Sequence, residues 1–415
     1  MPDQPVSLAH SLRRPQFLVL QLGIAFAGFV LIGVHDAALG VLLPSIQGEY
    51  TLDKRSVSTM FLASTSGYLM AAFSSGLLVE RLGRRVFLTL GGALLVAAMT
   101  TVATVPPWLT VLLALVGIGF GIAVVDAGLN TFVASLPNNT SLLNYLHAWF
   151  GVGALAGPLL ASTILAVGGR WNYVHVVLAV FALLLMIGFY FVFARSQTDP
   201  LPASESLPTI SGNVLTATLR LPLVWFAALF LFVYVGAEVS VGNWAYSYLL
   251  EERQVTPLIS GWLVSGYWLG LTLGRLVLGS VTRRLGDLRM IQLCLAVLGA
   301  GLVLLWIGPG TILAGAGLWL AGFSLGPIFP TMIAAMSRLV QPRLLPSAIG
   351  FLTSFGAGGA ALFPWIAGNA AEAWGVWTLL PYALGLVVIM LGLWLGFQTF
   401  MGQTVRQQSA VEMKT

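Results

Sequence analysis

Apolar stretches of about twenty residues recur along almost the whole chain, and an α-helix of that length spans a bilayer core about 30 Å thick. Breaks marked by charge, proline or glycine separate twelve such stretches. The sequence therefore predicts an all-α membrane protein. The predicted transmembrane helices are 16–44, 57–79, 86–105, 108–135, 143–168, 173–194, 220–250, 258–281, 289–307, 311–338, 346–373 and 377–400.

The composition leaves no room for a separate soluble domain. Only 8% of the residues are charged, whereas soluble domains have about 25%. The net charge of +5 comes from short loops, so it does not indicate nucleic-acid binding. The single cysteine, Cys294, excludes a disulfide framework. We find no P-loop, no metal-binding pattern and no nucleophile–base constellation, and therefore expect neither an enzyme nor a bound cofactor.

The distribution of basic residues predicts the orientation in the membrane. Arg13 and Arg14 precede an apolar run that is too long for a signal peptide, so we assign it to the first helix. With the N-terminus inside, the inner segments hold fourteen of the 19 Lys and Arg residues and the outer loops hold four. Lys and Arg accumulate in cytoplasmic loops. We expect a multi-pass protein of the cell inner membrane with both termini in the cytoplasm.

The two halves of the chain resemble each other. The segment G-L-L-V-E-R-L-G-R-R begins at Gly76, and G-S-V-T-R-R-L-G-D-L-R begins at Gly279, an offset of 203 residues. Further glycines recur in order at this offset, such as Gly119 and Gly322. We therefore expect two pseudo-symmetric six-helix bundles with the substrate site at their interface. The predicted domains are 1–195, a cytoplasmic linker at 196–219, and 220–415, which ends in a short polar tail.

The loop that begins at Gly76 resembles the signature of the major facilitator superfamily, with Glu80 where aspartate is usual. This resemblance implies the major facilitator fold and transport by alternating access. The predicted role of the loop is a conformational latch that holds the cytoplasmic ends of the bundles together in the outward-open state. Its residues are Glu80, Arg81, Gly83 and Arg84.

A narrower resemblance, to the fucose–proton symporter branch of that superfamily, rests on four segments. They are His35-Asp36, Asp126 to Asn130, Leu146 to Ala154, and Tyr234 to Glu238 with Trp244. The branch includes sugar permeases and sodium–glucose relatives. In it, acids of the first and fourth helices are linked to proton coupling and sugar binding. The resemblance therefore implies these roles for Asp36 and Asp126.

Three acids lie well inside apolar helices: Asp36, Asp126 and Glu238. A charged carboxylate at membrane depth costs at least about 2.5–3.5 kcal/mol, so it normally faces a cavity, a partner or a proton. We predict proton coupling for these three, with Asp126 as the strongest candidate. The alternative is that each ties helices together through hydrogen bonds. A fourth charge, Arg275, either pairs with an acid or reaches the cytoplasmic interface along its flexible stem, and we favour the second.

Polar and aromatic side chains near the expected cavity are candidates for substrate binding. Asn130 lies four residues after Asp126, on the same helix face, and the pair offers donors and acceptors for sugar hydroxyls. Asn144 and His147 are similarly spaced, and His147 could also relay protons. The alternative is helix packing for Asn130, a structural hydrogen bond for His147, and lipid contact or helix packing for the aromatic residues. The candidate set is Asn130, Asn144, His147, Tyr234, Trp244, Tyr267 and Phe329.

The leading hypothesis is a monomeric secondary active transporter that couples uptake of a sugar or other small polar solute to a proton, with sodium as the other possible ion. A proton-driven exporter of drugs or metabolites would share the fold and the carboxylates. A non-transporting membrane sensor or an integral-membrane enzyme is the third hypothesis. Membrane lipid is the other expected partner.

Overall fold

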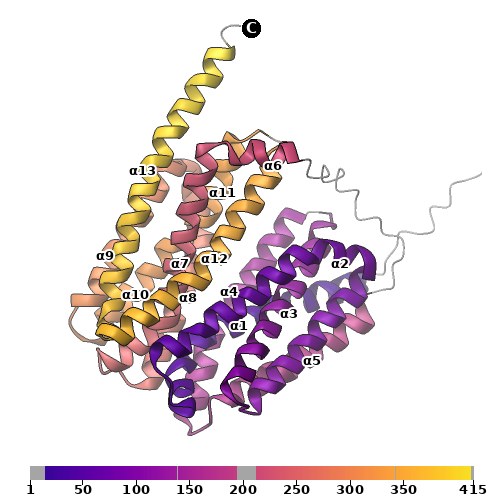
Figure 1. The fold of residues 1–415 in the computed structure, drawn as a ribbon, viewed down its shortest axis with the longest axis vertical. Coiled ribbons are helices and arrows are strands. Elements are labelled where there is room, and N and C mark those ends of the chain that lie inside the picture. Colours follow the sequence, from indigo (N-terminus) through magenta and orange to yellow (C-terminus); the bar gives the residue numbers. More distant parts are fainter. Residues whose placement is uncertain (1–14, 138, 194–211, 342, 413–415) are drawn as a thin grey trace, which may run out of the picture.

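In the computed structural model, residues 15–137, 139–193, 212–341 and 343–412 are described, and every regular element among them is a helix (Figure 1). This arrangement confirms the predicted all-α class. The elements are α1 (Pro15–Tyr50), α2 (Lys54–Ala103), α3 (Trp108–Ala134), α4 (Asn139–Ala166), α5 (Asn172–Val192), α6 (Gly212–Leu219), α7 (Pro222–Glu251), α8 (Pro257–Leu285), α9 (Asp287–Ile307), α10 (Gly310–Leu325), α11 (Ile328–Leu339), α12 (Leu345–Trp374), the 3-10 turn η2 (Val376–Thr378) and α13 (Leu379–Glu412).

Within the described residues, 10 helices are long and apolar enough to cross a membrane. One of them, α2, contains two predicted spans, because its 50 residues run on across a kink at Gly83. The helix predicted over 311–338 divides into α10 and α11 at Gly326-Pro327, where proline cannot donate a backbone hydrogen bond. α8 has 29 residues and a less apolar sequence. Counting α2 as two arms and adding α8 accounts for the twelve predicted spans.

The two kinks in equivalent loops have the same backbone conformation. Gly83 has φ 73° and ψ 154°, and Gly286, 203 residues later, has φ 79° and ψ 155°. This region of backbone space is essentially restricted to glycine. The sequence repeat around Gly76 and Gly279 is therefore matched by a repeat in local structure.

Helix contacts recur at the same offset. A Cβ atom added to Gly119 of α3 would lie 1.9 Å from the Ser64 carbonyl oxygen of α2. One added to Gly322 of α10 would lie 2.1 Å from the Tyr267 carbonyl oxygen of α8. Real Cβ atoms do not approach so closely, so both positions require glycine for backbone-to-backbone packing.

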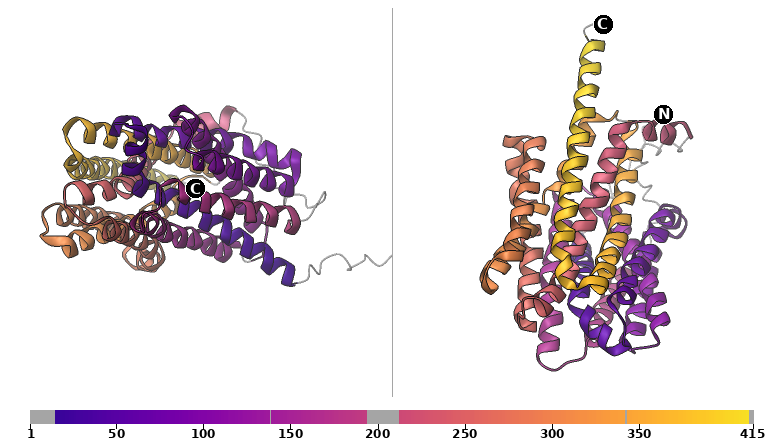
Figure 2. Two further views of the ribbon diagram at one scale, coloured as in Figure 1. Left: turned by 90° about the horizontal axis from the view of Figure 1, so that it is seen from below. Right: turned by 60° about the vertical axis from the view of Figure 1, so that its left-hand side comes forward.

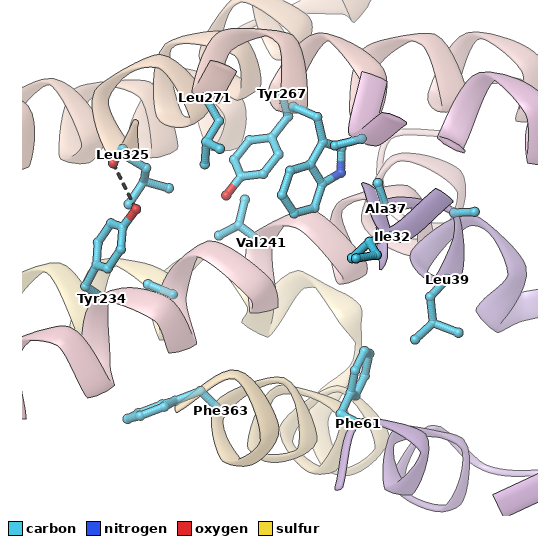
Figure 3. Packing of buried hydrophobic residues seen from close by; sticks show 14 of the residues in the cluster. Ile32, Ala37, Leu39, Phe61, Tyr234, Val241, Tyr267, Leu271, Leu325 and Phe363 are labelled. Carbon is cyan, nitrogen blue, oxygen red and sulfur yellow. Dashed lines mark hydrogen bonds between the residues drawn. The ribbon is translucent and has the colours of Figure 1, made fainter. Parts of the chain in front are cut away.

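The helices form two bundles that lie side by side (Figures 1 and 2). In the N-terminal bundle, α2 packs on α3 and α5, and α1 packs on α4. In the C-terminal bundle, α7 packs on α12 and α13, and α10 packs on α8 and α9. The bundles meet through α4 with α8, α2 with α12, and α1 with α7. Figure 3 shows buried residues where they meet, including Ile32, Phe61, Val241 and Tyr267.

The bundles touch at one end and diverge toward the other. The closed end carries the end of α1 and the start of α2; there Lys54 Nζ lies 3.0 Å from Glu251 Oε2, across the bundle interface. The Lys54 backbone N–H also donates to Glu372 Oε2 at 2.8 Å. The open end carries α6, and the ribbons of the two bundles separate toward it (Figure 1). Because α2 and α8 begin at the closed end, Gly83 and Gly286, at the far ends of these spans, lie at the open end.

Three predictions from the sequence concern the linker, the polar tail and the basic residues used for orientation. Residues 196–211 of the predicted linker lie outside the described residues, whereas 212–219 form α6. The predicted polar tail after 400 is a continuation of α13 to Glu412, because no proline stops the helix there. Of the basic residues used for orientation, four lie outside the described residues: Arg13, Arg14, Arg195 and Lys414.

Candidate coupling and substrate site

Asp126 of α3 is held by two neutral donors. The Tyr68 hydroxyl of α2 donates to Asp126 Oδ2 at 3.1 Å, and Asn130 Nδ2 donates to Oδ1 at 2.9 Å. The expected sharing of a helix face by Asp126 and Asn130 is therefore present as a direct hydrogen bond. All three side chains are half-buried. We call Asp36, Tyr68, Asp126 and Asn130 the acidic cluster.

Asp36 of α1 adds a second carboxylate to this cluster. Its side chain is exposed, although His35 and Ala37 on either side are buried. It is close enough to Asp126 for the two carboxylates to repel each other, and both act on the Tyr68 hydroxyl. Within the part of the chain that the structure describes, neither carboxylate has an ion-pair partner. The acidic cluster thus carries uncompensated negative charge when both groups are ionised.

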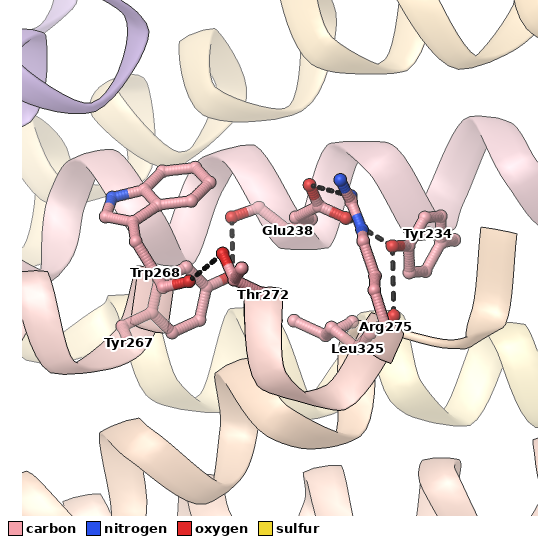
Figure 4. A network of polar contacts seen from close by, with 7 residues as sticks. All are labelled: Tyr234, Glu238, Tyr267, Trp268, Thr272, Arg275 and Leu325. Atoms are coloured by element: carbon pink, nitrogen blue, oxygen red, sulfur yellow. Dashed lines mark hydrogen bonds and ion pairs between the residues drawn. The ribbon is translucent and has the colours of Figure 1, made fainter. Parts of the chain in front are cut away.

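Glu238 of α7 has a different environment, because Arg275 of α8 neutralises it (Figure 4). Arg275 Nη2 lies 3.3 Å from Glu238 Oε1. The Tyr234 hydroxyl is hydrogen-bonded to the other Glu238 oxygen and lies 3.0 Å from the Leu325 carbonyl oxygen. The expectation that Arg275 reaches the membrane interface is wrong, since the packing of α7 on α8 gives it a carboxylate partner inside the bundle.

Tyr267 completes this second group of polar contacts. Its hydroxyl donates to the Glu238 backbone oxygen at 2.8 Å, and its side chain is fully buried. We call Tyr234, Glu238, Tyr267 and Arg275 the balanced cluster, because its one acid faces one base. The guanidinium side chain is 34% exposed, against 12% for the Glu238 side chain, so the arginine forms the accessible side of the pair.

The remaining candidates for substrate binding differ in accessibility. Trp244 is fully buried and donates to the Pro364 carbonyl oxygen at 2.9 Å. Phe329 is half-buried, with its ring centroid 6.4 Å from that of Tyr234. Asn144 and His147 are both exposed on α4. His147 also lies close enough to Arg275 for their charges to interact across the bundle interface.

The predicted latch residues lie at the open end. Glu80 and Arg81 are exposed, and Gly83 forms the kink described above. Arg84 lies over the Phe132 ring of its own bundle, 5.4 Å from the ring centroid. The latch role concerns the conformation in which this end is closed, and it stays a prediction.

Sequence reasoning left open that Arg275 pairs with an acid but did not identify Glu238 as that acid. One signal was available: a lone arginine in an apolar helix follows a helix with a lone glutamate, and charges at membrane depth usually pair. Which helix faces would meet could not be derived from spacing alone.

Comparisons with known proteins place these clusters in a family context. The chain is 27% identical over 388 residues to Bypass of stop codon protein 6 of Saccharomyces cerevisiae, covering 86% of this chain and 78% of that protein. It is 22% identical over 343 residues to the glucose/mannose transporter GlcP of Bacillus subtilis, covering 81% and 84%. The crystal structure of a bacterial homolog of the human lysosomal transporter Spinster, inward-facing and unoccupied, superimposes with a TM-score of 0.81 at 11% identity, covering 94% of this chain and 98% of that one.

The family comparison agrees with the fold. The Major Facilitator Superfamily matches residues 24–253 and again residues 229–408, so the match extends over both bundles. The family and its structural neighbours are transporters rather than enzymes, which confirms the expectation that this chain is not an enzyme. The narrower resemblance to the fucose–proton symporter branch stays a prediction. This chain therefore belongs to the Major Facilitator Superfamily and is a multi-pass membrane transporter.

Proposed function

We propose that this transporter is a proton-coupled symporter that takes up a sugar or another small polar solute by alternating access. The main support is the environment of Asp126: among the described residues, the hydrogen bonds to its two oxygens come from the neutral groups of Tyr68 and Asn130. A carboxylate without a counter-ion in apolar surroundings is costly, and binding a proton removes that cost. Asp126 is the proposed proton carrier, and Asp36 assists it through mutual repulsion.

Glu238 has a secondary role in this proposal. Its charge is already compensated by Arg275, so gaining a proton would break the ion pair and losing it would restore the pair, rather than relieve an isolated charge. We propose that protonation of Glu238 would release Arg275 toward the space between the bundles. Coupling through Glu238 would then act on substrate contacts, including those of His147 across the interface.

The open end is proposed to face the cytoplasm. The basic segments around Arg81 and Arg284 lie there, as the preference of Lys and Arg for the cytoplasmic side predicts. The structure would then be the inward-open state, with the Lys54–Glu251 pair closing the outer side. Both termini would be cytoplasmic, in the cell inner membrane. A single chain supplies both bundles, so a monomer suffices.

The substrate class is supported by the neutral hydrogen-bonding groups beside the acids and by similarity to a glucose/mannose transporter. Tyr68, Asn130 and Asn144 offer donors and acceptors suited to hydroxyl groups. We therefore propose hexoses as the first substrates to test, with lipophilic cations as the panel for the alternative function of an exporter.

The decisive experiment compares Asp126→Asn with the unchanged chain in proteoliposomes. We expect a sugar from the panel to carry protons inward, seen as a solute-dependent pH change that persists when sodium is replaced. Asp126→Asn should lose at least about tenfold of the uphill accumulation, because an amide cannot carry the proton. A factor of ten corresponds to about 1.4 kcal/mol. It should keep exchange of labelled for unlabelled sugar, because exchange needs no net proton movement.

The matched control is Glu49→Gln, which removes a carboxylate that pairs with Arg170 at the closed end, 3.1 Å away. This variant should accumulate sugar normally. Normal accumulation by Asp126→Asn would refute the coupling role. Binding of lipophilic cations and of no sugar would refute the substrate class, and a strict sodium requirement would refute the proton.

A further inference from the structure

One face of α8 packs against α4 across the bundle interface. A Cβ atom on Gly261 would lie 2.1 Å from Ser162 Oγ of α4, and one on Gly151 of α4 would lie 2.4 Å from Thr272 Oγ1 of α8. Ser265 and Trp268 lie between Gly261 and Thr272 at helical spacings of three and four residues. These two side chains therefore belong to the same interface face.

α7 meets α1 in a similar way beside this face. A Cβ atom on Gly40 would lie 2.5 Å from the Asn243 carbonyl oxygen. The Trp268 ring, in turn, rests on α7 at Gly242, where a Cβ atom would lie 2.6 Å from it. Asn243, Ser265 and Trp268 thus lie in the neighbouring interfaces of α7 and α8 with the N-terminal bundle. Figure 4 shows Trp268 at the opposite end of its stretch of α8 from Arg275.

Each of these three residues has a buried polar atom without a hydrogen-bond partner among the residues that the structure describes. The atoms are Asn243 Oδ1, Ser265 Oγ and Trp268 Nε1, and each residue is at most 4% exposed. An unmade hydrogen bond at a buried group is costly, so native proteins leave few of them. Trp244, the residue after Asn243 in α7, shows the ordinary outcome, because its Nε1 donates to the Pro364 carbonyl oxygen. The unpartnered atoms are explained if they serve a conformation in which the two bundles separate here.

We propose that Asn243, Ser265 and Trp268 form a substrate-binding surface that is covered in this structure and becomes accessible when the closed end opens. The three groups supply an acceptor, a hydroxyl that both donates and accepts, and an N–H donor beside an aromatic face. None is charged, so the fitting ligand is a neutral polyhydroxyl compound such as a hexose. The ligand class rests on the proposed function, whereas the location and its access from the closed end do not.

The first test is labelling of an introduced cysteine, in a background with Cys294→Ala, by a membrane-impermeant maleimide added to intact cells. Ser265→Cys should be labelled from outside when the closed end opens. The matched control is Ser240→Cys, an equally buried serine that lies within hydrogen-bonding reach of Tyr382 inside the C-terminal bundle. It should label at least tenfold more slowly. Asn144→Cys, exposed on α4, should label only from the cytoplasmic side and thereby checks the orientation.

Sugar protection then tests the ligand. A transported hexose should slow labelling of Ser265→Cys at least fivefold, and a lipophilic cation should not. Absence of labelling, or a rate equal to that of Ser240→Cys, would overturn the proposed accessibility. Labelling without protection by any hexose would overturn the proposed binding surface.

A second variant separates binding from folding. Trp268→Phe keeps an aromatic ring but removes Nε1, and it should raise the KM for influx about tenfold. Trp394→Phe makes the same chemical change at another buried, unpartnered Nε1, stacked on Phe397 within α13, and should change the KM less than twofold. Equal effects of the two would contradict the proposal. Neither the labelling nor this comparison requires proton coupling, so normal accumulation by Asp126→Asn would refute the coupling and leave the surface intact.

Discussion

The acidic cluster of the N-terminal bundle and the balanced cluster of the C-terminal bundle are built on matching scaffolds but have opposite electrostatics. The offset of 203 residues places Phe329 at the equivalent of Asp126, and His35 at the equivalent of Glu238. Asp36 and Asp126 have no base beside them in the described structure, whereas Glu238 lies 3.3 Å from Arg275. A repeated fold can therefore place a group that needs a proton in one half and an internally neutralised pair in the other.

The difference has an energetic meaning. A paired charge inside a protein is stabilised by its partner, and the protein loses most stability when only one of the two partners is removed. Neutralising an unpaired carboxylate removes the free-energy cost of a buried charge. Neutralising substitutions should therefore damage stability in the balanced cluster and damage coupling in the acidic cluster. This contrast can be tested by stability as well as by transport.

The largest effect is expected for Arg275→Met. Losing the guanidinium leaves Glu238 without its base, and removing one partner of a buried ion pair costs about 3–5 kcal/mol. Since the Arg275 side chain is 34% exposed, we expect about 3 kcal/mol, near the lower end. Thermal unfolding in detergent measures the loss. The double variant with Glu238→Gln should recover most of it, and a double variant as unstable as Arg275→Met would contradict the pairing. Asp126→Asn should lose less than about 1 kcal/mol by the same measurement, because it breaks no ion pair.

An intermediate effect is expected where the two bundles are alike. Gly83→Ala and Gly286→Ala each place a Cβ atom at a backbone conformation that is essentially restricted to glycine, at a cost of about 1–3 kcal/mol. The two losses in thermal stability should agree within about 1 kcal/mol, since the φ values are 73° and 79°. Gly76→Ala is the control, because a Cβ atom there meets nothing within 4 Å. Unequal losses of stability in Gly83→Ala and Gly286→Ala would contradict the structural equivalence of the two loops.

The smallest effect is expected where equivalent helix starts differ. Asp53 caps α2, with Oδ1 accepting the Ser56 N–H at 2.6 Å, while Thr256, at the equivalent position before α8, accepts the Ser260 N–H through its backbone carbonyl. Asp53→Ala should cost about 1 kcal/mol, and Thr256→Ala should cost less, because a side-chain cap is worth about that much. Thermal unfolding of both variants at pH 7 measures the difference.

Acid should abolish the contribution of the Asp53 cap. Hydrogen bonds from the Ser56 side chain and backbone hold the pKa of the Asp53 carboxyl below its usual value. A lowered pKa in the folded state means that the stabilisation is complete above the usual carboxyl pKa of about 4 and is lost as the pH falls through the lowered value. The gap between Asp53→Ala and the unchanged chain should therefore shrink on acidification below pH 4 or so. A gap that grows would exclude the charged cap.

Much of the architecture follows from the sequence alone. Backbone groups in a bilayer need internal hydrogen bonds, which helices and closed barrels provide, and stretches of about twenty apolar residues have the length of a spanning helix rather than of a barrel strand. The offset between Gly76 and Gly279 predicted a repeat, because glycines required for a kink or for close backbone contact recur wherever the backbone does. The helix face shared by Asp126 and Asn130 is equally local, since it depends only on helical spacing.

What tertiary structure alone decided is which distant side chains meet. Tyr68 is 58 residues from Asp126, and Arg275 is 37 residues from Glu238, and spacing within a helix says nothing about contacts between helices. For this reason the sequence predicted three similar acids, whereas the packing of α7 on α8 gave one of them a base and that of α2 on α3 gave another only neutral donors. The electrostatic difference between the bundles comes from those contacts, because the energy of a charge inside a protein is set by its neighbours in space rather than by its neighbours in the chain.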